Sequence, residues 1–139
     1  MGDYRLWALG SAVFAALTAI LSKKGLEGVP SNLAMVVRVG FVLIVTLCLA
    51  LATKEFRPQE LTPKHYLVLG GSAVATGLSW ICYFRALQLG EVSKVAPIDK
   101  LSFVMAMILG VIVLKEKPSL YTWAGAALVV CGVLLTLKG

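Results

Sequence analysis

Four ionisable residues lie inside segments that are long and apolar enough to cross a lipid bilayer. Asp99 and Lys100 occur together in one such segment, Arg38 in a second, and Arg85 near the end of a third. A charged side chain at membrane depth is costly unless it is paired or hydrated, so such residues usually mark the path of a solute or an ion. They suggest the binding of a charged solute, with Asp99 as the best candidate for a titrating or ion-pair switch.

The segment 93–114 carries the most costly of these charges. At 1.5 Å per residue it is about 33 Å long, against a hydrocarbon thickness of about 30 Å. Ser93 is a favourable N-cap and Pro97 would fall in the first turn, so we expect the helix to start there. Asp99 then lies roughly 9 Å below the helix end. The alternative is structural: Asp99 reaches the lipid headgroups from one turn inside.

The amino-acid composition indicates that these residues are carried by transmembrane helices. Of the 139 residues 59% are hydrophobic and only 14% are charged. A helical span needs about 20 apolar residues, and five runs reach or approach that length. The sequence therefore predicts an all-α membrane protein with five transmembrane helices in a single domain, residues 1–139. The expected spans are about 6–22, 32–53, 65–89, 93–114 and 120–137.

The formal charge of +6 would suggest nucleic-acid binding in a soluble protein, but most Lys and Arg residues here fall in short loops. They therefore indicate topology, and no nucleic-acid partner is expected. Call the bilayer face that bears the N-terminus the near face and the opposite one the far face. The near face has Arg5, Lys54, Arg57, Lys64, Lys115 and Lys117, and the far face has Lys23, Lys24, Lys94 and Lys138. Six against four favours a cytoplasmic N-terminus only weakly, and the count is level if Arg85 and Lys100 reach the far face.

Other chemistry finds little support in the sequence. Cys48, Cys82 and Cys131 lie in separate apolar runs without CxxC spacing, which indicates neither a metal site nor a disulfide framework. Asp99 has no partner acid and no base at recognisable spacing, so no catalytic residues, no cofactor and no enzyme activity are predicted. His65 is interpreted as a solvated residue at the membrane boundary.

Because successive spans cross the membrane in opposite directions, the four charges are expected at a similar depth in the bilayer. The second helix starts, the third ends and the fourth starts at the far face, so Arg38, Arg85, Asp99 and Lys100 lie one to three turns inside it. Three cations and one carboxylate give a site of formal charge +2, which attracts anionic or zwitterionic solutes. In the alternative, Arg85 and Lys100 extend to far-face phosphates while Arg38 and Asp99 form a structural pair.

An aromatic patch accompanies these charges. Trp80, Tyr83 and Phe84 are spaced i, i+3, i+4 on the third span, just above the charged layer. An aromatic wall beside a cation is a suitable binding surface, and Trp80 and Tyr83 are accordingly candidate substrate-binding residues. Contact with lipid or with a neighbouring helix is the alternative role.

The sequence resembles the EamA domain of the drug/metabolite transporter superfamily over nearly its whole length. The similarity lies in ILSKKGL at the end of the first span, Arg38 early in the second, and YFRALQLGEVSKVAP leading into the fourth. It continues with Glu116 after the fourth span and the closing WAGAALVVCGVLL. No single motif is specific, and the resemblance rests on their order and spacing together.

The resemblance implies one half of an inverted-repeat transporter. Most members carry two such domains around a central substrate cavity, so a single domain implies a homodimer or pairing with another half. Two copies of an odd number of spans, related by an axis in the membrane plane, are inserted oppositely; parallel and antiparallel dimers both stay open. We expect a transporter of a small metabolite or drug, working by alternating access in the lipid bilayer of a prokaryotic plasma (inner) membrane. The alternative is a non-transporting membrane subunit that assembles with or stabilises a partner transporter.

Overall fold

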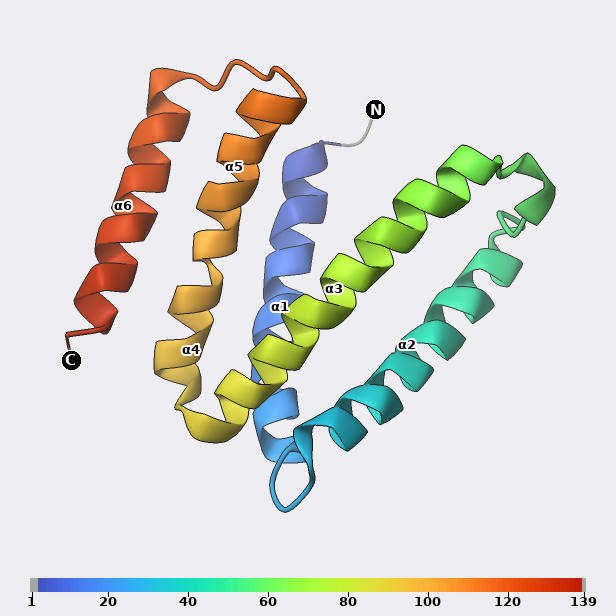
Figure 1. Ribbon diagram of the computed structural model, residues 1–139, viewed down its shortest axis with the longest axis horizontal. Coiled ribbons are helices and arrows are strands. Elements are labelled where there is room, and N and C mark those ends of the chain that lie inside the picture. The colour runs from blue at the N-terminus through green and yellow to red at the C-terminus, as the bar shows by residue number, and fades with distance from the viewer. Residues whose placement is uncertain (1–2, 139) are drawn as a thin grey trace. The chain divides into compact units, whose positions relative to one another are not determined.

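The computed structural model describes residues 3–138, and that range contains helices and connecting segments without a strand. Figure 1 shows the helices in chain order. Their bounds are α1 Tyr4–Gly25, α2 Ser31–Ala52, the short 3₁₀ turn η1 Pro58–Glu60, α3 Pro63–Leu89, α4 Val92–Asp99, α5 Leu101–Val113 and α6 Leu120–Thr136. The predicted all-α fold class is confirmed.

The chain divides into two compact units, Met1–Leu89 and Gly90–Gly139. In the first unit α2 and α3 run antiparallel and pack together, and α1 packs against α3 (Figure 1). In the second unit α4 and α5 follow one another end to end, and α6 packs antiparallel against both. The candidate site described below belongs to the first unit.

Most apolar side chains of the described residues face outward. The buried apolar side chains are small in number: Ala19, Leu26, Phe84, Leu87, Met107, Ala126 and Val133. The helices α1, α2 and α3 and the segment Val92–Val113 are each long and apolar enough to cross a membrane, while α6, with 17 residues, is shorter. Because an exposed apolar surface of this extent needs lipid or another protein around it, the fold is that of an integral multi-pass membrane protein.

A reciprocal cap starts α3 at Pro63, two residues before the expected span 65–89. Pro63 is the first helical residue, and the His65 amide donates to the Thr62 hydroxyl oxygen at 3.4 Å. In return the Thr62 amide donates to Nδ1 of His65 at 3.2 Å. The arrangement resembles a capping box in which histidine replaces the usual glutamate or glutamine. His65, expected only as a boundary residue, therefore helps to start the helix.

The fourth predicted span differs from the expectation at both its start and its middle. The helix begins at Val92 after Glu91 as N-cap, rather than after Ser93, so Pro97 lies inside α4 instead of in its first turn. Proline lacks an N–H and crowds the preceding turn. Beyond Pro97 the backbone makes tighter i to i−3 hydrogen bonds, from the Lys100 amide to the Pro97 carbonyl at 3.0 Å and from the Phe103 amide to the Lys100 carbonyl at 3.1 Å. The expected continuous helix is therefore interrupted at Lys100.

Two lysines end helices in a left-handed backbone conformation. Lys54 follows α2 with φ 59°, and Lys115 follows α5 with φ 56°. At the end of α2 the Lys54 amide donates to the Leu51 carbonyl at 3.2 Å, and the Glu55 amide donates to the Ala50 carbonyl at 2.9 Å. These two bonds define a Schellman cap, in which glycine is the usual left-handed residue.

Candidate functional site

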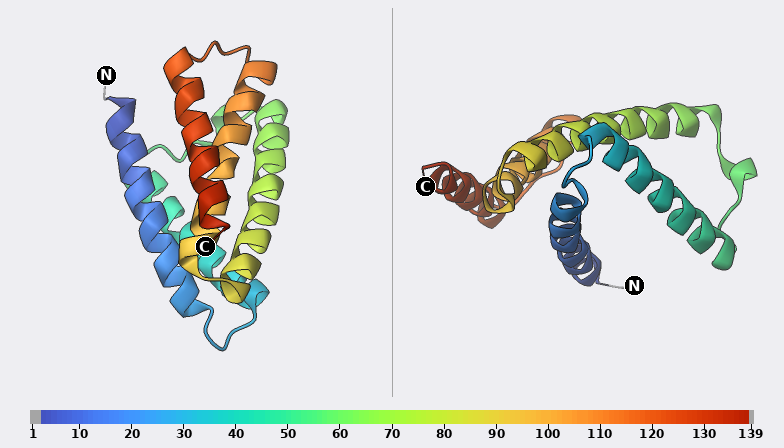
Figure 2. Two further views of the ribbon diagram at one scale, coloured as in Figure 1. Left: turned by 90° about the vertical axis from the view of Figure 1, so that its left-hand side faces the viewer. Right: turned by 90° about the horizontal axis from the view of Figure 1, so that it is seen from below.

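A groove runs between α1 and α2 in the first unit. The two helices diverge from the turn that joins them (Figure 2), and in this turn Gly28 has φ 70°. The space between them has a volume of about 750 Å³, and α3 contributes Phe84 to its wall. Small-molecule sites typically enclose about 300–1,000 Å³, so the groove has the capacity for a small organic solute.

Arg38 brings the charge into this groove. It lies seven residues into α2, roughly 10 Å along the helix axis. Its guanidinium carbon is 4.3 Å from the centroid of the Trp80 ring and 5.5 Å from that of Phe84. Both aromatic residues come from α3, which packs against α2. Cation–π stacking of this kind offsets part of the cost of removing the charge from water.

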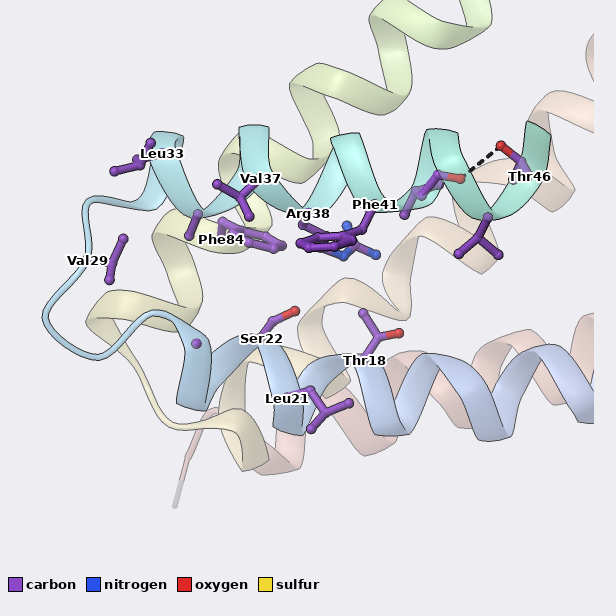
Figure 3. Close-up of a pocket in the computed structure, with 14 residues that line it drawn as sticks. Thr18, Leu21, Ser22, Val29, Leu33, Val37, Arg38, Phe41, Thr46 and Phe84 are labelled. Atoms are coloured by element: carbon purple, nitrogen blue, oxygen red, sulfur yellow. Dashed lines mark hydrogen bonds between the residues drawn. The ribbon is translucent and has the colours of Figure 1, made fainter. Parts of the chain in front are cut away.

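The remaining polar groups of the groove are hydroxyls. Figure 3 shows Thr18 and Ser22 of α1 facing Arg38 and Phe41 of α2 across the space. The Thr46 hydroxyl is already engaged, because it donates to the Val42 carbonyl at 2.8 Å within α2. The groove is thus an apolar channel with one cation and two hydroxyls that face it.

Two hydrogen bonds fix the end of the groove where α1 meets α2. Nζ of Lys23, in the last turn of α1, donates to the Leu87 carbonyl of α3 at 2.6 Å. Nε2 of Gln88 donates to the Val29 carbonyl in the turn between α1 and α2 at 2.8 Å. Neither residue was identified from the sequence. The one available signal was the pair of lysines in the last turn of α1, where cations favour a helix C-terminus.

The other predicted site residues have different surroundings. Arg85 is exposed and donates to Oε1 of Gln88 at 3.0 Å, outside the groove wall. Tyr83 is half-buried and is also outside that wall, but it interacts electrostatically with Arg38. In the second unit, Nζ of Lys100 lies 3.6 Å from Oδ2 of Asp99, with both side chains partly exposed at the helix interruption. The structure therefore brings Arg38 together with Trp80, and Asp99 together with Lys100.

The gathering of all four charges at one level stays a prediction, because Arg38 and Arg85 belong to one unit and Asp99 and Lys100 to the other. Within residues 3–138 no group of three or more His, Cys, Asp or Glu side chains is arranged to hold a metal ion. What the groove offers is electrostatic attraction, hydrogen bonding and apolar contact.

Comparison with known proteins identifies the class. The profile of the EamA-like transporter family matches residues 4–138, and the chain belongs to this family. It is 44% identical over 134 residues to a Sinorhizobium sp. protein described as "Uncharacterized transporter in cobO 3'region", a match that covers 96% of this chain and 95% of the relative. No solved structure matches the chain. The expected EamA resemblance is confirmed, and the chain is a membrane transporter protein by family.

Proposed function

We propose that the chain moves a small solute across the membrane by alternating access, with the groove between α1 and α2 as part of the solute path. The observation that carries this proposal is the position of Arg38: a cation well inside an apolar helix, facing a space of about 750 Å³. A charge retained at such a depth is costly and usually functional. Family membership and the relative's description as a transporter support the same function.

We further propose that the working unit is a homodimer. The match to the Sinorhizobium protein covers 95% of that relative, so the relative has room for little beyond one such domain. Transporters built from inverted repeats place their substrate sites at the interface between two repeats. A second copy of this chain supplies the second repeat, and the exposed apolar faces of the helices provide a surface for it. The membrane we propose is the plasma (inner) membrane of a prokaryote.

Flux in proteoliposomes tests the transport function. Purified protein is reconstituted alone and supplied in turn with radiolabelled amino acids, sugars, nucleotide precursors, organic acids and cationic drugs. Transport predicts saturable uptake of at least one class that is absent from empty vesicles. A non-transporting subunit would move none of these solutes alone, and would restore flux only with a partner protein.

Accessibility of the two termini tests the dimer geometry. A tag at each end is probed with an impermeant reagent in intact cells and after permeabilisation. Because five spans place the two termini of one molecule on opposite sides of the membrane, an antiparallel homodimer predicts that the N-terminus is labelled from outside in about half of the molecules and the C-terminus in the other half. A single orientation in every molecule contradicts the antiparallel dimer and leaves the parallel one.

A further inference from the structure

Arg38 has hydrogen-bonding capacity that the described part of the chain leaves unused. Its guanidinium stacks on Trp80 at 4.3 Å and on Phe84 at 5.5 Å, contacts that engage the flat face of the group. Tyr83 interacts with the guanidinium electrostatically. Within residues 3–138, however, the N–H groups of Arg38 donate to no hydrogen-bond acceptor, and no carboxylate pairs with it. A guanidinium has five N–H donors around its edge in a fork that matches carboxylate geometry. Stacking therefore fixes the plane of the fork and leaves its edge free for a ligand.

The groove supplies no negative charge of its own. None of its wall residues is acidic; the wall is formed mainly by Leu, Val and Phe side chains of α1 and α2. Across from Arg38, the hydroxyls of Thr18 and Ser22 have no hydrogen-bond partner within the described residues (Figure 3). A hydroxyl both donates and accepts, so these two can complete the hydrogen bonding of an anionic group held by Arg38.

We propose that the groove binds a small amphipathic organic anion, with its anionic group at Arg38 and its apolar body along the α1 and α2 walls. The anion neutralises a cation that would otherwise be desolvated without a counter-charge, and the apolar body removes hydrocarbon surface from water. The inference names the substrate class of the proposed transporter, and it rests on that proposed function for the statement that the bound anion is carried across the membrane.

The same features disfavour other solutes. An organic cation would be repelled by Arg38, since like charges in a poorly solvated space repel strongly. A sugar carries more hydroxyl groups than the groove can satisfy, and each unsatisfied group loses its hydration without compensation. A small inorganic anion would leave most of the 750 Å³ without contacts. Charge and apolar bulk are therefore required together.

A matched ligand series on the unaltered protein tests the inference. Naphthoate, naphthamide and naphthylmethylammonium share one ring system and carry negative, zero and positive charge at neutral pH. Dissociation constants are measured by calorimetry for the full chain in an uncharged maltoside detergent. Hydrogen bonds to charged groups are roughly twice as strong as neutral ones, so we expect naphthoate to bind at least about tenfold more tightly than naphthamide, and the ammonium compound most weakly. Equal affinities, or a preference for the cation, would overturn the inference.

Substitutions assign the preference to Arg38. Arg38→Gln should reduce naphthoate affinity to that of naphthamide, and Arg38→Lys should give an intermediate value because it keeps the charge but loses the planar fork. Arg57→Gln is the matched control, since Arg57 is exposed and pairs with Glu60 outside the groove. If Arg38→Gln does not fold, the series on the unaltered protein still decides the outcome. A preference for naphthoate that persists in folded Arg38→Gln contradicts the assignment.

Two further comparisons are needed. The first distinguishes a soluble anion from an acidic lipid as the occupant of the groove, and the second distinguishes the anion-binding inference from the proposed transport function. Nanodiscs of phosphatidylcholine, with and without phosphatidylglycerol, show whether an acidic lipid competes with naphthoate; strong competition would make the lipid the occupant and overturn the soluble-anion inference. Anion-selective binding without flux in proteoliposomes would refute the proposed transport while the binding site stands. Flux of other solutes without anion-selective binding would refute the anion-binding inference while the proposed transport function stands.

Discussion

Lys23→Met is expected to destabilise the first unit by removing a hydrogen bond between two distant helices. Nζ of Lys23 donates to the Leu87 carbonyl at 2.6 Å, 64 residues away along the chain. Methionine keeps most of the aliphatic length of lysine but cannot donate. Leu87 is fully buried, with 0% of its surface exposed, so water cannot replace the ammonium group at its carbonyl.

The expected loss follows from the position of this carbonyl in the last turn of α3, where backbone carbonyls lack intrahelical partners. Side-chain hydrogen bonds in membrane proteins contribute about 0.6 kcal/mol on average and up to about 1.7 kcal/mol. The charge of Lys23 near the C-terminus of a helix adds about 0.3–1 kcal/mol. Together these give a decrease of about 1–2 kcal/mol in the free energy of unfolding.

The assay is reversible unfolding in mixed micelles with an increasing fraction of dodecyl sulfate, followed by circular dichroism. Lys24→Met is the matched control, because the neighbouring Lys24 is exposed and its side chain makes no hydrogen bond within the described residues. Lys24→Met removes only a charge near the C-terminus of α1, worth about 0.3–1 kcal/mol, so it should stay more stable than Lys23→Met. If the two variants had the same stability, the bond to Leu87 would contribute nothing and the proposed cause would be wrong.

Three further outcomes are expected. Alanine is a better helix former than glycine by about 1 kcal/mol, but a methyl group on Gly110 would lie 2.8 Å from Oε2 of Glu116. In the Glu116→Ala background, Gly110→Ala should therefore raise the unfolding free energy by about 1 kcal/mol. With Glu116 present the increase should be smaller. Thr62→Ala should lower the unfolding free energy by about 1 kcal/mol through loss of the cap at the start of α3, while Thr62→Ser should change it little; unfolding of both variants in micelles measures this. Asp99→Asn should abolish or uncouple flux in proteoliposomes and keep the helical circular dichroism spectrum; unchanged flux across the solute panel would exclude Asp99 from the mechanism.

The positions of the helices could be predicted because bilayer thickness and local capping residues act on short stretches of sequence. The third span was expected from about residue 65, and α3 starts two residues earlier, at Pro63, with Thr62 as its capping residue. At the start of α4 two caps compete, and the chain begins the helix after Glu91 rather than after Ser93. This choice moves Pro97 into the helix interior, and the helix is interrupted three residues later, at Lys100.

The site could be predicted only in part, because its contacts join helices that are distant in sequence. Arg38 was identified from its depth in an apolar run, and the spacing of Trp80 and Phe84 correctly placed them on one helix face. That this face packs against Arg38 depends on how α2 and α3 associate. The bonds made by Lys23 and Gln88 span 64 and 59 residues, so no local pattern indicates them.

Lys54 and Lys115 have two roles: each lies in the turn that ends a helix, and each contributes to the loop charges that influence the orientation of the chain in the membrane. A side chain in the left-handed conformation costs about 1–2 kcal/mol relative to its absence, so glycine would relax both turns. Yet these lysines are two of the six cations on the predicted near face, against four on the far face. Replacing both with glycine leaves four on each side and removes the weak charge bias from which a cytoplasmic N-terminus is predicted. With glycine at both positions the two turns would be less strained, but the loop charges would no longer favour one orientation of the protein in the membrane.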